Sequence, residues 1–158
     1  MKPILFLCLV ISLVSCNGFS QKKDNKGTTY DIVKTNAEWK AQLTPLQYRV
    51  LRQEGTEQPF SSEINKIYEP GTYVCAACDT PLFESDSKFD SGTGWPSFDD
   101  YIKGNVLFSK GSGGMYGTEE HCATCGGHLG HVFNDGPRKT TGKRHCINGV
   151  ALKFVPKS

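Results

Sequence analysis

The sequence has no large excess of charge of either sign and no hydrophobic run long enough to cross a membrane. The main apolar run, residues 4–14, is shorter than the ~20 residues that a membrane-spanning helix needs. Its 18 Lys and Arg residues nearly balance 16 Asp and Glu residues, and no basic stripe is interleaved with aromatics, so a nucleic-acid partner has little support. No Gly-rich phosphate cradle or dinucleotide fingerprint is present, and we therefore expect no bound nucleotide cofactor.

The composition is that of one turn-rich domain. A chain of 158 residues is enough for one compact domain and too short for two comfortable ones. The 17 Gly and 8 Pro residues indicate many turns, while nine Phe, six Tyr and two Trp supply strand-forming and core-filling rings. Seven cysteines cannot all pair within one chain, so their positions matter more than their number.

The first residues have the features of an export signal. Lys2 precedes the apolar run and polar residues follow it directly, as in a secretory signal peptide. Residues 13–16 (LVSC) resemble a bacterial lipobox, so we expect a signal peptide over residues 1–15 and a lipid on Cys16, with cleavage after residue 20 as the alternative. Either way we expect an exported protein of the periplasm or cell envelope, anchored to the membrane if lipidated. Residues 16–34 are polar and predict a flexible tether to a domain over residues 35–158.

Two short helices are predicted at the start of this domain. Residues 35–38 (TNAE) and 44–47 (TPLQ) both fit a capping box, and Pro45 stands at the first helical position of the second. We expect Gly55 to end the second helix.

Beyond residue 60 the pattern is typical of β structure. Short β-like runs at residues 73–75, 106–108, 131–133 and 150–155 are separated by turn signals such as residues 69–71 and 134–137. Because no long helix intervenes, we predict a mainly β (α+β) domain with antiparallel sheets and an N-terminal helical cap.

Four of the cysteines form two matched CxxC knuckles, at Cys75 and Cys78 and at Cys122 and Cys125. Four thiolates are the ligands of a closed structural zinc site, and we expect one zinc ion here. The intervening residues 79–121 exceed the spacing of compact zinc ribbons, so two disulfides or a thioredoxin-like redox pair remain alternatives. His121 adjoins a knuckle, but four sulfurs already fill the site and we expect it in a loop.

One cysteine, Cys146, is left once zinc and export account for the rest. If its segment is a strand, Arg144, Cys146 and Asn148 share one face. A guanidinium beside a thiol stabilises the reactive thiolate, and an amide can orient a substrate or a proton donor. An inert buried cysteine is the alternative, which the polar neighbours disfavour. His128 and His131, in a Gly-rich segment upstream, are candidate general acids or bases.

Together these segments resemble the type-B methionine sulfoxide reductases, which reduce the R epimer at sulfur. The resemblance covers nearly all of residues 35–155. Its most specific parts are GWPSF at residues 94–98, HLGHVF at residues 128–133 and RHCIN at residues 144–148; further matching segments are residues 43–60, 71–78, 81–83, 89–93, 122–127 and 135–137.

The resemblance implies roles for individual residues. Cys146 is the nucleophile and becomes a sulfenic acid, and the ring of Trp95 packs against the substrate S-methyl group. His128 and His131 polarise or protonate the sulfoxide oxygen, while Arg144 and Asn148 support the thiolate and its hydrogen bonds. The implied fold has two antiparallel sheets with the helices at their edge. The substrate is methionine sulfoxide in oxidised proteins, with the free amino acid a further possibility.

The sequence departs from the family pattern at three positions. Thr93 stands where many members have a resolving cysteine, so we predict a one-cysteine cycle in which a thioredoxin-like or other external thiol reduces the sulfenic acid. His145 replaces the usual Tyr and Gly149 the usual Ser, changes that bear on pH dependence and substrate preference. A non-catalytic zinc-ribbon-like binding module and a general thiol-disulfide oxidoreductase are the rival hypotheses.

Overall fold

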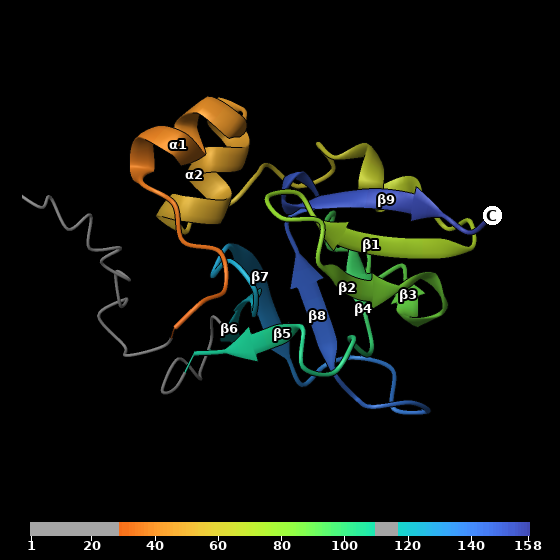
Figure 1. The fold of residues 1–158 in the computed structure, drawn as a ribbon. Helices are drawn as coiled ribbons and strands as arrows, with labels where there is room; N and C mark the ends of the chain where they lie inside the picture. The colour runs from red at the N-terminus through yellow and green to blue at the C-terminus, as the bar shows by residue number, and fades with distance from the viewer. Residues whose placement is uncertain (1–28, 110–116) are drawn as a thin grey trace, which may run out of the picture.

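The computed structural model describes residues 29–109 and 117–158 of the protein, which form two antiparallel sheets and two short helices (Figure 1). The predicted mainly β class, with two antiparallel sheets and an N-terminal helical pair, is confirmed. Within the described ranges, no helix is long and apolar enough to span a membrane. The predicted signal peptide and Cys16 lie outside the described residues.

Both helices begin where the capping boxes predicted. Thr35 caps α1 (Asn36–Gln42) and Thr44 caps α2 (Pro45–Gln53), each by accepting a hydrogen bond from a backbone N–H of the first turn. The end of α2 differs in detail, because Glu54 rather than Gly55 adopts the left-handed conformation, with φ 55°. Gly55 instead lies so close to Arg49 that a Cβ would overlap the Arg49 side chain and carbonyl.

The smaller sheet has the strand order β2-β1-β9. Its strands are β1 (Gly71–Cys75), β2 (Pro81–Glu84) and β9 (Leu152–Pro156). We expected a strand from residue 150 onward, but residues 149–151 form the 3-10 helix η3 (Gly149–Ala151). The chain turns there because the backbone N–H groups of Gly149 and Val150 both donate to the buried carboxylate of Glu57.

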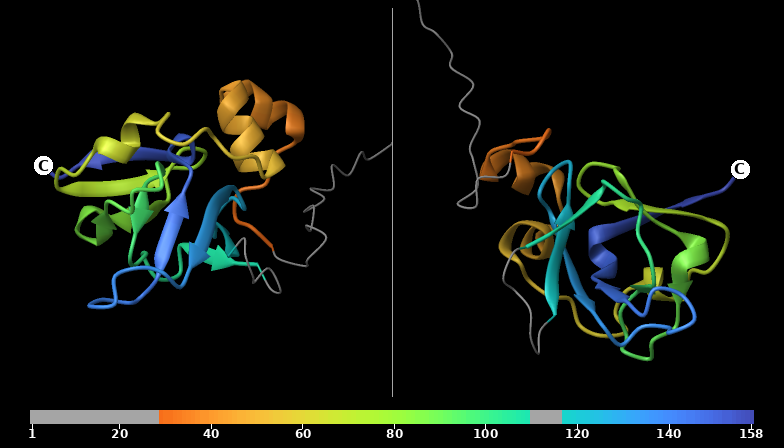
Figure 2. Two further views of the ribbon diagram at one scale, coloured as in Figure 1. Left: turned by 180° about the vertical axis from the view of Figure 1, so that it is seen from behind. Right: turned by 90° about the horizontal axis from the view of Figure 1, so that it is seen from below.

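The larger sheet has the order β3-β4-β8-β7-β6-β5, and all its described pairings are antiparallel. Figure 2 shows β7 and β8 side by side at its centre. Its strands are β3 (Lys88–Phe89), β4 (Ser97–Phe98), β5 (Val106–Phe108), β6 (Thr118–Cys122), β7 (His128–Phe133) and β8 (Arg144–Ile147).

An aromatic core joins the two sheets. Phe98 of β4 stacks on Phe83 of β2 with ring centroids 4.3 Å apart, and Tyr73 of β1 meets Phe98 edge-on at 5.0 Å. All three side chains are buried. Because side chains alternate along a strand, the face of β8 that carries His145 and Ile147 belongs to this core side. Cys146 therefore lies on the opposite face of the larger sheet.

Helix α2 packs over β7 and η3 with its buried residues Tyr48, Val50 and Leu51, and α1 packs against α2. Polar contacts tie them to both CxxC segments: Gln42 donates to the carbonyl of Ala77, and Arg52 donates to that of Cys125. Residues 29–34, the last part of the predicted tether, also approach the second knuckle, where the N–H of Ile32 donates to Thr124. The boundary at residue 34 and the tether itself stay predictions.

Candidate active site

Cys146 occupies the centre of a polar row across the larger sheet. It lies opposite Ser97 of β4 on one side and His131 of β7 on the other, and His131 in turn lies opposite Glu119 of β6. Directly opposed residues in antiparallel strands present their side chains on one face. The row thus places a thiol beside an imidazole, on the face directed away from the aromatic core.

Burial and two neighbouring side chains determine the direction in which the pKa of the Cys146 thiol is shifted. Burial raises its pKa above the ordinary value and outweighs the opposing effects of the Arg144 charge and the Thr93 hydroxyl, both of which lower the pKa. The predicted effect of Arg144 therefore has the expected direction, but it does not by itself make the thiolate the main form. Cys146 as a residue is half-buried, unlike the fully buried Ser97 opposite it.

Arg144 is held in place by a carboxylate that the sequence analysis did not single out. Its Nε and Nη2 atoms donate to the two carboxylate oxygens of Asp135, both at 2.9 Å. Its guanidinium also lies 4.4 Å from the ring centre of Phe133. The turn after β7 makes this possible, since a Cβ at Gly136 would overlap the backbone of Lys143. The signal for Asp135 was the turn itself, which brings its carboxylate back to β8.

The two candidate histidines lie together at 5.4 Å between ring centroids. His128 is buried and its Nδ1 is 2.9 Å from Oε1 of Glu119, which fixes the ring and directs its other nitrogen away from that carboxylate. Burial and the nearby His128 lower the pKa of His131. His131 is therefore neutral at neutral pH, the form that can both donate and accept a proton.

Trp95 enters from the loop between β3 and β4. Its indole N–H donates to the backbone carbonyl of Glu57 at 3.3 Å, and its side chain stays half-exposed. The next residue, Pro96, accepts a hydrogen bond from the N–H of Ile147, so the loop is tied to the strand that carries Cys146. The structure thus brings the Trp95 loop to the Cys146 strand, while the substrate-binding role of its ring stays a prediction.

Asn148 follows β8 and is buried. Its amide nitrogen donates to the carbonyl of Leu129 at 2.9 Å, and its oxygen accepts from the N–H of Glu57 at 3.0 Å. Asn148 therefore holds the backbone of the residue next to His128, and its contact to the Cys146 thiolate stays a prediction.

Glu57 is the residue that the sequence analysis missed most clearly. Its backbone binds Trp95 and Asn148, and its carboxylate accepts the N–H groups of Gly149 and Val150 at 2.6 and 2.9 Å. Burial raises the pKa of this carboxyl group, although the two N–H bonds oppose the shift. No local pattern identifies Glu57, because every one of these partners is distant in the sequence.

The four knuckle cysteines converge on one point between the two sheets. Their sulfur atoms all lie within 4.8 Å of one another, with Cys75 and Cys125 at 3.8 Å and Cys78 and Cys122 at 3.5 Å. A tetrahedral ion with metal–sulfur bonds of ~2.3 Å needs sulfurs roughly 3.8 Å apart, so the donor set fits. Hydrogen bonds from its neighbours, first from Cys122, lower the pKa of Cys78. His121 lies in β6 rather than in the expected loop and is not part of this group.

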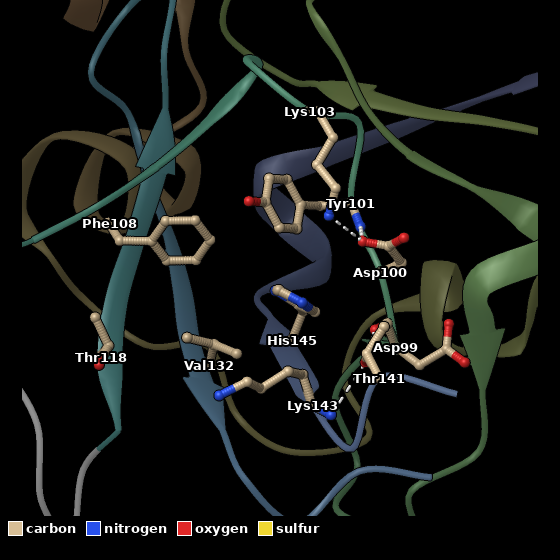
Figure 3. A pocket seen from close by; sticks show the side chains of 10 residues that line it. All are labelled: Asp99, Asp100, Tyr101, Lys103, Phe108, Thr118, Val132, Thr141, Lys143 and His145. Atoms are coloured by element: carbon tan, nitrogen blue, oxygen red, sulfur yellow. Dashed lines mark hydrogen bonds and ion pairs between the residues drawn. The ribbon is translucent and has the colours of Figure 1, made fainter. Parts of the chain in front are cut away.

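A cavity of about 410 Å³ lies on the core side of the larger sheet and does not include Cys146 (Figure 3). His145 is central to it, flanked by the rings of Tyr101 at 5.3 Å and Phe108 at 6.4 Å. Its Nδ1 is 2.6 Å from Oε1 of the fully buried Glu120. The sheet separates this cavity from the polar row, so we place the reactive site at Cys146.

Comparison with known proteins gives one consistent result. Residues 43–156 match the family model described as the SelR domain. A peptide methionine sulfoxide reductase MsrB of Leptospira interrogans is 54% identical over 127 residues, which cover 79% of this chain and 96% of that protein. An MsrB of Methanosarcina barkeri is 54% identical over 125 residues, 78% of this chain and 87% of the relative. Methionine-R-sulfoxide reductase B3, mitochondrial, of Mus musculus is 49% identical over 127 residues, 79% of this chain and 50% of the relative.

Proposed function

We infer that this chain, which belongs to the SelR-domain family of type-B methionine sulfoxide reductases, uses Cys146 to reduce the R sulfoxide of methionine in oxidised proteins. The observation that carries the choice of nucleophile is the polar row. Among the described residues, Cys146 is the one cysteine outside the four-sulfur cluster, and it lies opposite the imidazole of His131.

The reaction we propose is the transfer of one oxygen atom. The thiolate of Cys146 attacks the electrophilic sulfur of the sulfoxide, and a proton reaches the sulfoxide oxygen. The oxygen ends on Cys146 as a sulfenic acid and the substrate leaves as methionine. The sulfoxide is thereby reduced by two electrons and Cys146 is oxidised by two.

The neighbouring groups suit this step. Arg144 stabilises the thiolate through its charge, while Asp135 holds the guanidinium at that position. The neutral His131 and the clamped His128 supply ring N–H groups toward the oxygen. The half-exposed ring of Trp95 offers an apolar surface to the S-methyl group, a contact that free methionine sulfoxide can also make.

Cys146 returns to the thiol through an external reductant. Two thiols, from a thioredoxin-like protein or from small molecules, convert the sulfenic acid into a thiol with release of water and a disulfide. Mass spectrometry after one turnover without reductant, with a sulfenic-acid trap, tests this cycle. The expected product is trapped Cys146, and an internal disulfide involving Cys146 would overturn it.

We propose zinc as the ion of the four-sulfur cluster. Four thiolates at tetrahedral separation form a closed structural site, so the ion would join β1 and β6 without contacting substrate. One zinc per chain, lost together with folding stability on strong chelation, is the expected result. Four thiols committed to metal cannot shuttle electrons, which also counts against the thiol-disulfide oxidoreductase hypothesis.

We further propose that the enzyme acts outside the cytoplasm as a lipoprotein. The support is in residues 1–16, where an apolar run precedes a lipobox-like LVSC. Labelling with a radioactive fatty acid, in the parent chain and in Cys16→Ala, tests the proposal. Label in the parent alone is expected, and an unlabelled parent would refute the lipid.

A further inference from the structure

Three hydroxyl groups form a chain that leads to the reactive sulfur. Ser97 Oγ is 2.7 Å from Ser91 Oγ, and Ser91 Oγ is 2.8 Å from Thr93 Oγ1. Ser97 lies directly opposite Cys146 in the neighbouring strand, and the Thr93 hydroxyl lies close enough to Cys146 to lower the pKa of its thiol. Ser97 is fully buried, so its hydroxyl must find partners within the protein. The three hydroxyls therefore form a cluster beside the reactive sulfur, carried by a short loop and by β4.

The backbone of this loop holds the hydroxyl groups of Ser91 and Thr93 in position. Asp90 Oδ1 accepts from the N–H of Gly92, and the N–H of Thr93 points to Ser91 Oγ at 3.4 Å. Gly92 has φ 70° and Gly94 has φ 91°, so the loop turns sharply on both sides of Thr93. The carbonyl of Gly94 is in turn bound by the N–H of Phe60. Thr93 is thus held by its own loop and by the segment that carries Glu57.

The hydrogen bonds between the three hydroxyls can run in two directions, because each hydroxyl donates one proton and can also accept one. Beside a thiol, Ser97 donates to the carbonyl of Trp95 at 3.2 Å, and each of the other two hydroxyls donates toward Ser97. Beside a thiolate, all three donate toward the sulfur. Reversal needs only rotation of the hydroxyl groups, with no proton leaving an oxygen, and hydrogen bonds aligned in a chain strengthen one another.

We propose that Thr93 is a catalytic residue of this enzyme, whose hydroxyl, oriented by Ser91 and Ser97, donates a hydrogen bond to the Cys146 thiolate as it attacks. The inference rests on the proposed function, which names the thiolate as the nucleophile. Unlike a cysteine at this position, a hydroxyl cannot form a disulfide with the oxidised sulfur. The same contact therefore supports attack and leaves the sulfenic acid open to an external thiol.

The charged groups around Cys146 show why such a donor matters. Arg144 on the same strand lowers the pKa of Cys146, but burial and Glu120 of β6 raise it. His131 faces it from β7, where its ring is neutral, and Glu119 lies beyond His131 in the row. Apart from Arg144, the groups on these packed strands bring no fixed positive charge to the sulfur, and the loop side contributes hydroxyls.

The test compares hydroxyl variants by a readout that does not need turnover. The pH dependence of Cys146 alkylation by iodoacetamide is followed by mass spectrometry of its peptide, in zinc-loaded mature protein. In Thr93→Val, which keeps the shape and loses the hydroxyl, we expect about tenfold slower alkylation at pH 7 and a midpoint about one unit higher. Thr93→Ser should stay within about threefold of the parent, because the donor is retained. Ser91→Ala should lie between them, and Thr140→Val, an exposed hydroxyl on a distant turn, should match the parent.

The outcomes separate this proposal from the reductase assignment. A folded Thr93→Val that is alkylated at the parent rate and midpoint refutes the hydrogen bond, whatever the activity. If that variant does not fold, an unchanged alkylation profile in Ser91→Ala refutes the chain in the same way. A parent protein with no sulfoxide turnover would refute the reductase function, but it would leave the alkylation comparison intact.

Discussion

Removal of the Glu57 carboxylate should strongly destabilise the folded protein. The group is 4% exposed and accepts two backbone N–H bonds from the start of η3. In Glu57→Ala these two donors lose their partner, at about 1–3 kcal/mol for each buried group left unsatisfied. Val150 is only partly buried, so water can replace part of its loss. We therefore expect a decrease of about 3 kcal/mol in the free energy of unfolding.

Glu57→Gln should cost less, about 1–2 kcal/mol, because one amide oxygen still accepts. Urea unfolding of zinc-loaded protein measures both values, and Glu63→Gln is the matched control. Glu63 is exposed and pairs only with the exposed Lys66, so its loss should cost less than about 0.5 kcal/mol. A Glu57→Ala protein that lost less than about 1 kcal/mol would refute the assignment of Glu57 as the clamp on η3.

The same residue predicts the direction of a pH effect. Burial raises the pKa of Glu57 in the folded state above its ordinary value of 4.5. Folding then favours the protonated carboxyl, so the part of the stability that is linked to this titration is fully present below the ordinary pKa and is lost as pH rises through the raised one; the two N–H bonds themselves remain when the group is ionised. This part of the pH dependence should be absent in Glu57→Gln, and a slope identical to that of the parent would contradict the argument.

Three further predictions concern the metal, the guanidinium and the loop. Chelation of zinc should abolish the cooperative thermal transition or lower its midpoint by more than about 10 °C, measured by calorimetry alongside elemental analysis; an unchanged transition in metal-free protein would contradict a structural ion. Arg144→Gln should slow alkylation of Cys146 at pH 7 by about tenfold while Arg138→Gln, at an exposed position, has no effect; equal rates would refute the contact. After one turnover, Thr93→Cys should form an internal disulfide with Cys146 on a non-reducing peptide map, whereas a trapped sulfenic acid alone would show that the two side chains do not meet.

Local patterns in the sequence predicted the helices and the cluster of four cysteines well. Both capping boxes and both CxxC knuckles are formed by residues within a few positions of one another, and each is present as predicted. The strands were harder, because β3 and β4 have two residues each and are held by pairing partners rather than by an alternating pattern of their own. Pairing with β8 makes β4 a strand, and no window of the sequence contains both.

The same limit applies to the site. The segments near Cys146 in the sequence predicted two of its neighbours, and Arg144 and His131 do lie beside it. Glu57 and Asp135 were not singled out because their contacts form only after the chain has folded back on itself. The direction of the Cys146 pKa shift could not be predicted from the adjacent residues either. Burial depends on the whole fold, and its effect on the pKa outweighs that of the adjacent guanidinium.

The most direct test of the central claim is reduction of the two separated sulfoxide epimers of a protected methionine, with dithiothreitol as the reductant. The zinc-loaded mature domain and its Cys146→Ser variant would be compared, with folding of both confirmed by circular dichroism. Turnover of the R epimer alone, abolished in the variant, is the result that we predict. No turnover of either epimer by the folded parent, or equal turnover by Cys146→Ser, would contradict the account and favour a non-catalytic binding module or another nucleophile respectively.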